Sequence, residues 1–168
     1  EKTIDTKAKA FSLWSYFSLN TTMTFQNSLL HTGGVPLVSI LVAYKKNEIP
    51  HYYVDAIKEY SKRLQRYCSL TLQEVNSPQE LMPLLSSYYT FSVHHKGQSL
   101  DSVSFSKKLQ SLTLQGHSKI AFLLNMKTDC DDSLSLTTLD LSDDLSIVCM
   151  LEQLYRAFRI WYGEPYHK

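Results

Sequence analysis

The sequence is poor in the residues that mark covalent crosslinks, unusual backbones or membrane spans. Its three cysteines, Cys68, Cys130 and Cys149, are far apart and odd in number, which argues against a disulfide framework and is compatible with a reducing compartment. Five glycines and five prolines among 168 residues exclude a collagen-like or low-complexity chain. No apolar run is long enough to span a bilayer, so we expect a cytoplasmic protein without a membrane partner.

The chain also lacks an excess of charge of either sign. Seventeen lysines and arginines face sixteen aspartates and glutamates, which leaves a formal net charge of +1. Composition therefore gives no support for nucleic-acid binding, and such a partner would have to meet a local basic face. The length suits one domain, or one domain with an arm.

What the sequence does contain is an alternation of strands and helices. Short β-branched or continuously apolar runs predict strands, and apolar residues at steps of three and four predict helices. This alternation is typical of an α/β fold with a mostly parallel sheet and helices on both faces. The predicted strands cover residues 37–43, 70–75, 88–94 and 120–124, and the predicted helices cover residues 50–67, 78–85, 102–115 and 143–162.

Residues 1–34 differ from the rest of the chain. They are rich in Ser, Thr and Asn, carry scattered aromatic residues and end in Thr32-Gly33-Gly34, a pattern typical of a linker. We interpret residues 1–34 as a flexible N-terminal arm or an extension outside the domain. A packed accessory element is the alternative. The domain is predicted to cover residues 35–168.

The titratable residues of the chain do not predict a metal site. His94 and His95 are adjacent, so on a strand their side chains point to opposite faces. Asp129, Asp131 and Asp132 lack the central glycine and distal glutamate of a calcium loop. We therefore predict no metal ligand, and interpret the three aspartates as a solvated loop.

The most informative stretch is the end of the chain. Apolar residues from Val148 to Trp161 recur at helical spacing, Ser142 is a suitable N-cap, and Gly163 follows as a stop signal. The strings Tyr155-Arg156-Ala157-Phe158-Arg159-Ile160 and Gly163-Glu164-Pro165-Tyr166-His167-Lys168 closely resemble the C-terminal signature of the RlmH family. These proteins are SPOUT-type methyltransferases that act on a pseudouridine of large-subunit ribosomal RNA.

The resemblance extends over about residues 35–168 and implies specific properties. It implies a SPOUT-like fold with a C-terminal trefoil knot, a homodimer, S-adenosyl-L-methionine as cofactor, and ribosomal RNA or the assembled ribosome as partner. By the same resemblance the C-terminal tail of one subunit reaches the other subunit's pocket, where Tyr166 and His167 are the catalytic candidates. Arg156, Arg159 and Lys168 are the candidates for RNA phosphates, and an ion pair at the dimer interface is the alternative for Arg156.

The implied cofactor loops depart from the family pattern at their start. The family has a Gly-Gly-x-x-Gly loop after the fourth predicted strand, where this chain has Asn125-Met126-Lys127-Thr128-Asp129. The cofactor-binding candidates carried over by the resemblance are Val93, Asn125, Met126, Leu134, Ser135, Leu136, Thr137, Thr138 and Leu139. Two hypotheses follow: methylation of a ribosomal pseudouridine in a rebuilt pocket, or a catalytically inactive dimer that binds RNA or the ribosome. A dimer that binds another small ligand is a third.

Overall fold

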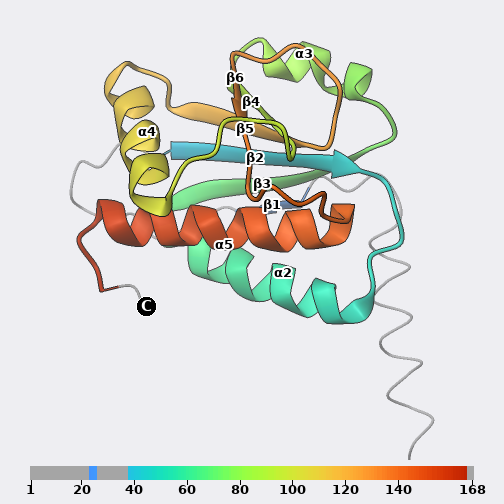
Figure 1. Ribbon diagram of the computed structural model, residues 1–168, viewed down its shortest axis with the longest axis horizontal. Helices are drawn as coiled ribbons and strands as arrows, with labels where there is room; N and C mark the ends of the chain where they lie inside the picture. The colour runs from blue at the N-terminus through green and yellow to red at the C-terminus, as the bar shows by residue number, and fades with distance from the viewer. Residues whose placement is uncertain (1–22, 26–37, 166–168) are drawn as a thin grey trace, which may run out of the picture.

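The structure is a computed structural model that describes residues 23–25 and 38–165. A sheet of six strands, in the order β1-β3-β2-β5-β4-β6, forms its centre (Figure 1). Five neighbouring strands run parallel, and β1 pairs antiparallel with β3 at one edge. The strands are β1 (Met23–Phe25), β2 (Val38–Lys45), β3 (Cys68–Val75), β4 (Tyr89–Val93), β5 (Lys119–Leu124) and β6 (Asp132–Leu134).

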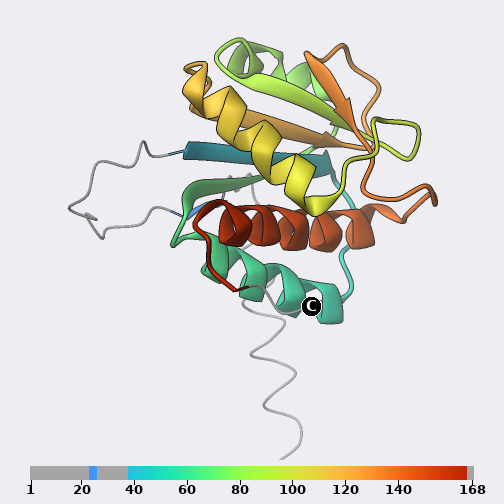
Figure 2. The same ribbon diagram turned by 60° about the vertical axis from the view of Figure 1, so that its left-hand side comes forward.

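Helices cover both faces of this sheet, which confirms the predicted α/β architecture. The larger helices, α2 (His51–Leu64), α4 (Ser102–Leu114) and α5 (Asp143–Trp161), lie on one face. The short 3₁₀ helix η1 (Pro78–Leu81) and helix α3 (Met82–Leu85) lie on the other (Figure 2). Among the described helices none is long and apolar enough to cross a membrane.

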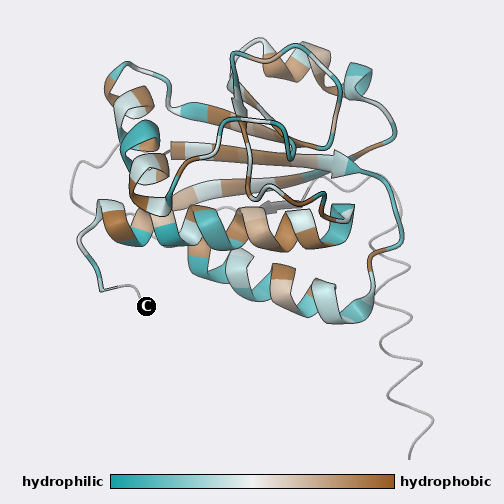
Figure 3. Ribbon diagram, viewed as in Figure 1, coloured by the Kyte–Doolittle hydropathy of each residue, from teal (hydrophilic) through white to brown (hydrophobic). Residues whose placement is uncertain are grey.

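The sheet separates two hydrophobic cores because strand side chains alternate between its faces. In β2, Ile40 and Val42 pack toward α2, α4 and α5, whereas Leu41 and Ala43 pack toward η1 and α3. Figure 3 shows the resulting apolar sheet interior against helices with mixed faces. Phe158 of α5 is fully buried in the larger core, and burial of such a ring contributes roughly 2–3 kcal/mol.

The structure refines several predicted boundaries. Ser142 caps α5, its Oγ accepting from the Leu145 amide at 3.4 Å, and Gly163 ends it with a φ of 65°. Helix α2 ends at Leu64, three residues before the predicted end, because the chain turns to enter β3. Two strands, β1 and β6, were not predicted. Strand β1 falls within residues 1–34, and its backbone pairs with β3 at Met23↔Leu72.

Candidate cofactor site

The carboxyl ends of β4 and β5 meet the start of α5 around a small cavity. Parallel strands bring these ends to one edge of the sheet, which is where α/β folds place ligands. In Figure 1 the chain returns from β6 across this edge before α5 begins. The cavity has a volume of about 20 Å³ and is lined by Val93, His94, His95, Asn125, Leu136, Thr137, Leu139, Asp140, Leu141 and Ser146.

Five of the nine predicted cofactor-binding residues line this cavity: Val93, Asn125, Leu136, Thr137 and Leu139. They come from three separate segments, namely the end of β4, the residue after β5 and the loop that leads from β6 to α5. The sequence therefore predicted residues that the fold brings together. His94, His95 and Asp140 share the lining, although sequence reasoning did not place them there.

The other four predicted residues lie outside the lining. Leu134 is buried in the larger core, and Ser135 is buried with its Oγ donating to the Thr137 carbonyl at 2.7 Å. Thr138 is exposed on the loop. Met126 is 3% exposed and packs on the opposite face of the sheet, in the core below η1 and α3. A side chain at position 126 therefore takes no room from this cavity.

Asn125 fills the place of the first family glycine by adopting a glycine-like backbone. Its φ is 52°, the one positive value for a non-glycine residue in the described ranges, and Asn tolerates this left-handed region better than most residues. Its amide Nδ2 donates to Asp143 Oδ1 at 2.8 Å and to Ser146 Oγ at 3.4 Å. The side chain thus ties the end of β5 to the first turn of α5.

Two further contacts hold the walls of the cavity. His95 Nδ1 lies 3.5 Å from Asp140 Oδ1, so protonated His95 links the loop after β4 to the loop after β6. Gly97 lies directly against the Leu134 backbone: a Cβ at position 97 would come within 2.5 Å of the Leu134 carbonyl carbon and oxygen. A glycine is required here for close approach of the two segments.

The lining suits the cofactor in kind but not in size. Leu136, Leu139 and Leu141 offer apolar surface for a purine ring, and the Asp140 carboxylate is suitable for a cationic ligand. A volume of about 20 Å³, however, holds little more than one water molecule. Leu139 and Asp140 are 70% and 79% exposed, so this loop has few buried contacts that oppose outward movement. Cofactor binding requires such a movement.

The predicted RNA-binding arginines are engaged within the chain. Arg156 pairs with Glu152 one turn earlier in α5, with Nη2 at 2.8 Å from Oε1. Arg159 Nη1 donates to the Tyr155 hydroxyl at 3.2 Å, and its Nη2 donates to the Pro165 carbonyl. Tyr166, His167 and Lys168 lie outside the described residues.

Sequence reasoning missed Glu164, which fixes the base of the C-terminal tail. Its Oε2 accepts from the Tyr67 hydroxyl at 2.6 Å and lies 3.0 Å from Arg159 Nε, and its Oε1 lies 3.4 Å from Arg66 Nη2. Burial and the hydrogen bond to Glu164 raise the pKa of Tyr67 to about 12. The available signal was a single acidic residue after the helix stop at Gly163, next to the predicted catalytic pair.

Comparison with known protein families first assigns this fold and site to a class of enzyme. Residues 38–167 match the family model described as "Predicted SPOUT methyltransferase". The parallel sheet, its crossover helices and a cavity at the strand ends are the parts that this match covers.

The similar proteins narrow the assignment. The chain is 36% identical over 124 residues to Ribosomal RNA large subunit methyltransferase H 1 of Thermoanaerobacter sp. (strain X514), covering 73% of this chain and 93% of that protein. The methyltransferase H proteins of Leuconostoc citreum and Clostridium kluyveri are 33% and 31% identical, over 70% and 78% of this chain and 92% and 99% of their own lengths. The chain therefore belongs to the RlmH family of SPOUT methyltransferases, as its C-terminal signature predicted.

Proposed function

We propose that this protein methylates a pseudouridine of large-subunit ribosomal RNA with S-adenosyl-L-methionine as methyl donor. The observation that carries the proposal is the family match over residues 38–167, together with relatives named for methylation of this RNA. The cavity between β4, β5 and α5 supports it, because predicted cofactor residues from three segments converge there.

The reaction needs a group that accepts a proton and side chains that hold the pseudouridine ring in place. When bound, S-adenosylmethionine supplies an electrophilic methyl group. The pseudouridine ring nitrogen must lose its proton as it takes the methyl group, and we assign His167 to accept that proton. Tyr166 stacks on the base or hydrogen-bonds to it, and Lys168 contacts a phosphate. Glu164 fixes the start of this tail by its contacts with Tyr67 and Arg159.

The finer architecture is part of the proposal. We infer a C-terminal trefoil knot in which α5 passes beneath the loops that follow β4 and β6, and a homodimer in which each tail serves the partner's cavity. Partly exposed side chains on α2 and α5, among them Tyr60, Val148 and Cys149, offer an interface. Residues 1–34 act as an arm of the domain of residues 35–168 that adds the edge strand β1 to its sheet, and the protein works in the cytoplasm.

A second function is favoured by the size of the cavity. With the Asn125 side chain in the lining where the family has a glycine and a cavity of about 20 Å³, a dimer that binds RNA or the ribosome without catalysis is the competing candidate. It keeps the fold, the final helix and the tail, and loses only the cofactor.

Calorimetric titration of the full chain with S-adenosylmethionine separates these two functions. The methyltransferase proposal expects a dissociation constant in the micromolar range, about −7 to −8 kcal/mol, and transfer of labelled methyl to large-subunit RNA or ribosomes that lack the modification. His167→Ala should abolish transfer and leave cofactor affinity unchanged. Binding of ribosomes without heat on cofactor titration and without transfer would instead establish the inactive dimer.

A further inference from the structure

A second and much larger hollow opens at the opposite end of the sheet from the cofactor cavity. It lies where β4 and β5 begin and has a volume of about 330 Å³, within the range of small-ligand sites. Strand β5 has six residues, so the two sites are roughly 20 Å apart. The hollow is lined by Ser86, Ser87, Tyr88, Tyr89, Gly116, His117, Ser118, Lys119 and Asp131.

Two pairs of aromatic and basic side chains form its walls. The Lys119 ammonium lies 5.9 Å from the centre of the Tyr88 ring, and the His117 ring centre lies 5.0 Å from that of Tyr89. Lys119 and His117 are exposed, whereas both tyrosines are half-buried. Within the described part of the chain Lys119 makes no ion pair, so its charge is available to a ligand.

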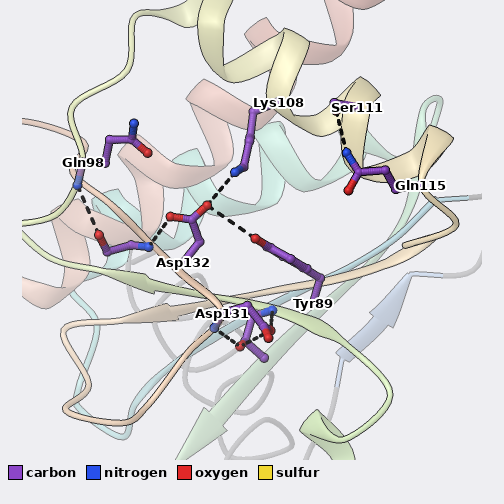
Figure 4. Close-up of polar contacts among 9 residues, drawn as sticks. Tyr89, Gln98, Lys108, Ser111, Gln115, Asp131 and Asp132 are labelled. Atoms are coloured by element: carbon purple, nitrogen blue, oxygen red, sulfur yellow. Dashed lines mark hydrogen bonds and ion pairs between the residues drawn. The ribbon is translucent and has the colours of Figure 1, made fainter.

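The acidic residues beside this hollow differ in their availability (Figure 4). Asp132 is occupied: its Oδ2 lies 2.6 Å from Lys108 Nζ and accepts from the Tyr89 hydroxyl at 3.4 Å. Asp131 lines the hollow, and among the described residues its side chain accepts hydrogen bonds at Oδ2 alone, from the Thr90 amide at 2.8 Å and the Thr90 hydroxyl at 2.7 Å. Those hydrogen bonds lower the pKa of Asp131 and keep it ionised.

We propose that this hollow binds one ribonucleotide unit. Lys119 and His117 would contact the phosphate. Tyr89 packs toward the larger core and Tyr88 toward the core below η1 and α3, so the two rings lie on opposite faces of the sheet and one of them would stack on the base. Asp131 would accept a hydrogen bond from a ribose hydroxyl, a role that carboxylates have in nucleotide sites.

Other ligand classes use the lining less well. A free phosphate leaves both tyrosines and Asp131 unused. A metal ion lacks ligands, since the described residues contain no group of three metal-ligating side chains. An apolar ligand would cover the Lys119 ammonium without offering it a partner.

The shared chemistry, a ribose with a phosphate and a base, can come from a free nucleotide or from an RNA strand. The test is an NMR titration of the full chain with uridine monophosphate and, separately, with a short oligouridylate. We expect shifts in the amides of Tyr88 and residues 116–119 with both ligands, and a mononucleotide dissociation constant of about 1 mM or tighter. Binding of the oligouridylate more than about tenfold tighter identifies a strand as the ligand, and similar affinities identify a free nucleotide.

Matched lysine variants decide whether the hollow is responsible. Lys119→Met removes the ammonium but keeps an aliphatic stem on Tyr88, and we expect it to weaken binding about tenfold. Lys58→Met, at an exposed position of α2, should leave binding unchanged. Equal affinity of the Lys119→Met and unmodified proteins, or no amide shifts up to about 10 mM nucleotide, would overturn the proposal.

Two controls keep these results interpretable. Deoxyuridine monophosphate should bind more weakly than the ribonucleotide, and equal binding would overturn the assignment of Asp131 to the ribose. The proposal does not depend on methyl transfer, because S-adenosylmethionine titrates the cavity at the other end of β5. Failure at one site therefore leaves the result at the other intact.

Discussion

The two ends of α5 contact the rest of the protein through different kinds of interaction. At its amino end, Asp143 and Asp144 accept from the neutral amides of Asn125 and Asn47 at 2.8 and 2.5 Å. At its carboxyl end, Arg159, Arg66 and Glu164 form an ion-pair cluster. A hydrogen bond between a carboxylate and an amide depends little on salt, whereas partly exposed ion pairs are screened. Substitutions that change side-chain size should therefore have the larger effect at the cofactor end of α5. Changes of salt concentration and pH should have the larger effect at the tail end.

The largest expected effect is at the cofactor end, from Gly97→Ala. A Cβ at position 97 would meet the Leu134 backbone at 2.5 Å, which neither segment can relieve without separating the loop after β4 from β6. We expect a loss of about 2–3 kcal/mol in the free energy of unfolding, measured by urea denaturation. Ser99→Ala, on the same loop, is the control. Wild-type stability of Gly97→Ala would show that this loop does not help to fix β6.

A second prediction separates the two positions at which the family has glycine. Asn125→Gly keeps the left-handed backbone and removes a side chain from the cavity lining. We expect S-adenosylmethionine to bind on the order of tenfold more tightly, with a loss of about 1 kcal/mol in stability from the missing hydrogen bonds. Calorimetry and urea denaturation measure the two effects.

Met126→Leu is the matched control, because Met126 packs in the opposite core and this substitution conserves volume. Neither cofactor affinity nor stability should change by more than about 1 kcal/mol. If Asn125→Gly leaves cofactor affinity unchanged, the loop of residues 136–141, and not the Asn125 side chain, closes the cavity.

The behaviour of positions 125 and 126 shows where sequence reasoning ends. Alternation along β5 places Ile120, Phe122 and Leu124 on the α5 side, and by the same rule Met126 would follow them. The left-handed turn at Asn125 breaks that alternation and sends Met126 to the other face. The tolerance of Asn for such a backbone was predictable. Its contacts with Asp143 and Ser146 were not, because they join residues 18 and 21 positions apart.

The fold itself was largely predictable for residues with strong periodicity. Strands β2, β3, β4 and β5 and helices α2, α4 and α5 have apolar patterns that the two cores explain. Strand β6 was missed because Asp132, Ser133 and Leu134 have little strand propensity. They form a strand because the exposed edge of β4 offers backbone partners, at Phe91↔Asp132 and Val93↔Leu134. That edge exists only after the sheet has assembled.

At the tail end, Tyr67 should make stability depend on high pH. Its folded pKa is raised to about 12, above the ordinary value of 10. The protonated hydroxyl therefore contributes stability that is fully present below about pH 10 and is lost as the pH rises toward 12. Between about pH 10 and pH 12 the unmodified protein should lose free energy of unfolding. We expect the Tyr67→Phe variant to lose about 1 kcal/mol less over the same range.

Tyr44 is the matched control for this measurement. Burial and the nearby Glu74 also raise its pKa to about 12, so Tyr44→Phe removes a similar alkaline titration without touching the tail. Only Tyr67→Phe should also release Glu164. An alkaline loss of stability unaltered by Tyr67→Phe would show that burial and the hydrogen bond to Glu164 do not raise the pKa of Tyr67 in solution.

The smallest expected effect is the salt dependence of the tail attachment. Glu164→Gln keeps an acceptor for the Tyr67 hydroxyl but removes the charge that Arg159 and Arg66 share. Because these side chains are partly exposed, we expect a loss of only about 0.5–1 kcal/mol at low salt. That difference should vanish near 1 M salt, where the Debye length is about 3 Å.

Glu59→Gln, which breaks the exposed pair with Arg63 in α2, should have a smaller effect still, because a single exposed pair on one helix contributes only about 0.3–0.5 kcal/mol. The same two variants also test the role of the tail in methyl transfer. If Glu164 holds the tail in place, Glu164→Gln should lower the rate of methyl transfer at low salt without changing cofactor affinity, whereas Glu59→Gln should change neither. Equal behaviour of the two variants at every salt concentration would mean that the tail does not depend on charge for its attachment, and the contrast between the two ends of α5 would fail.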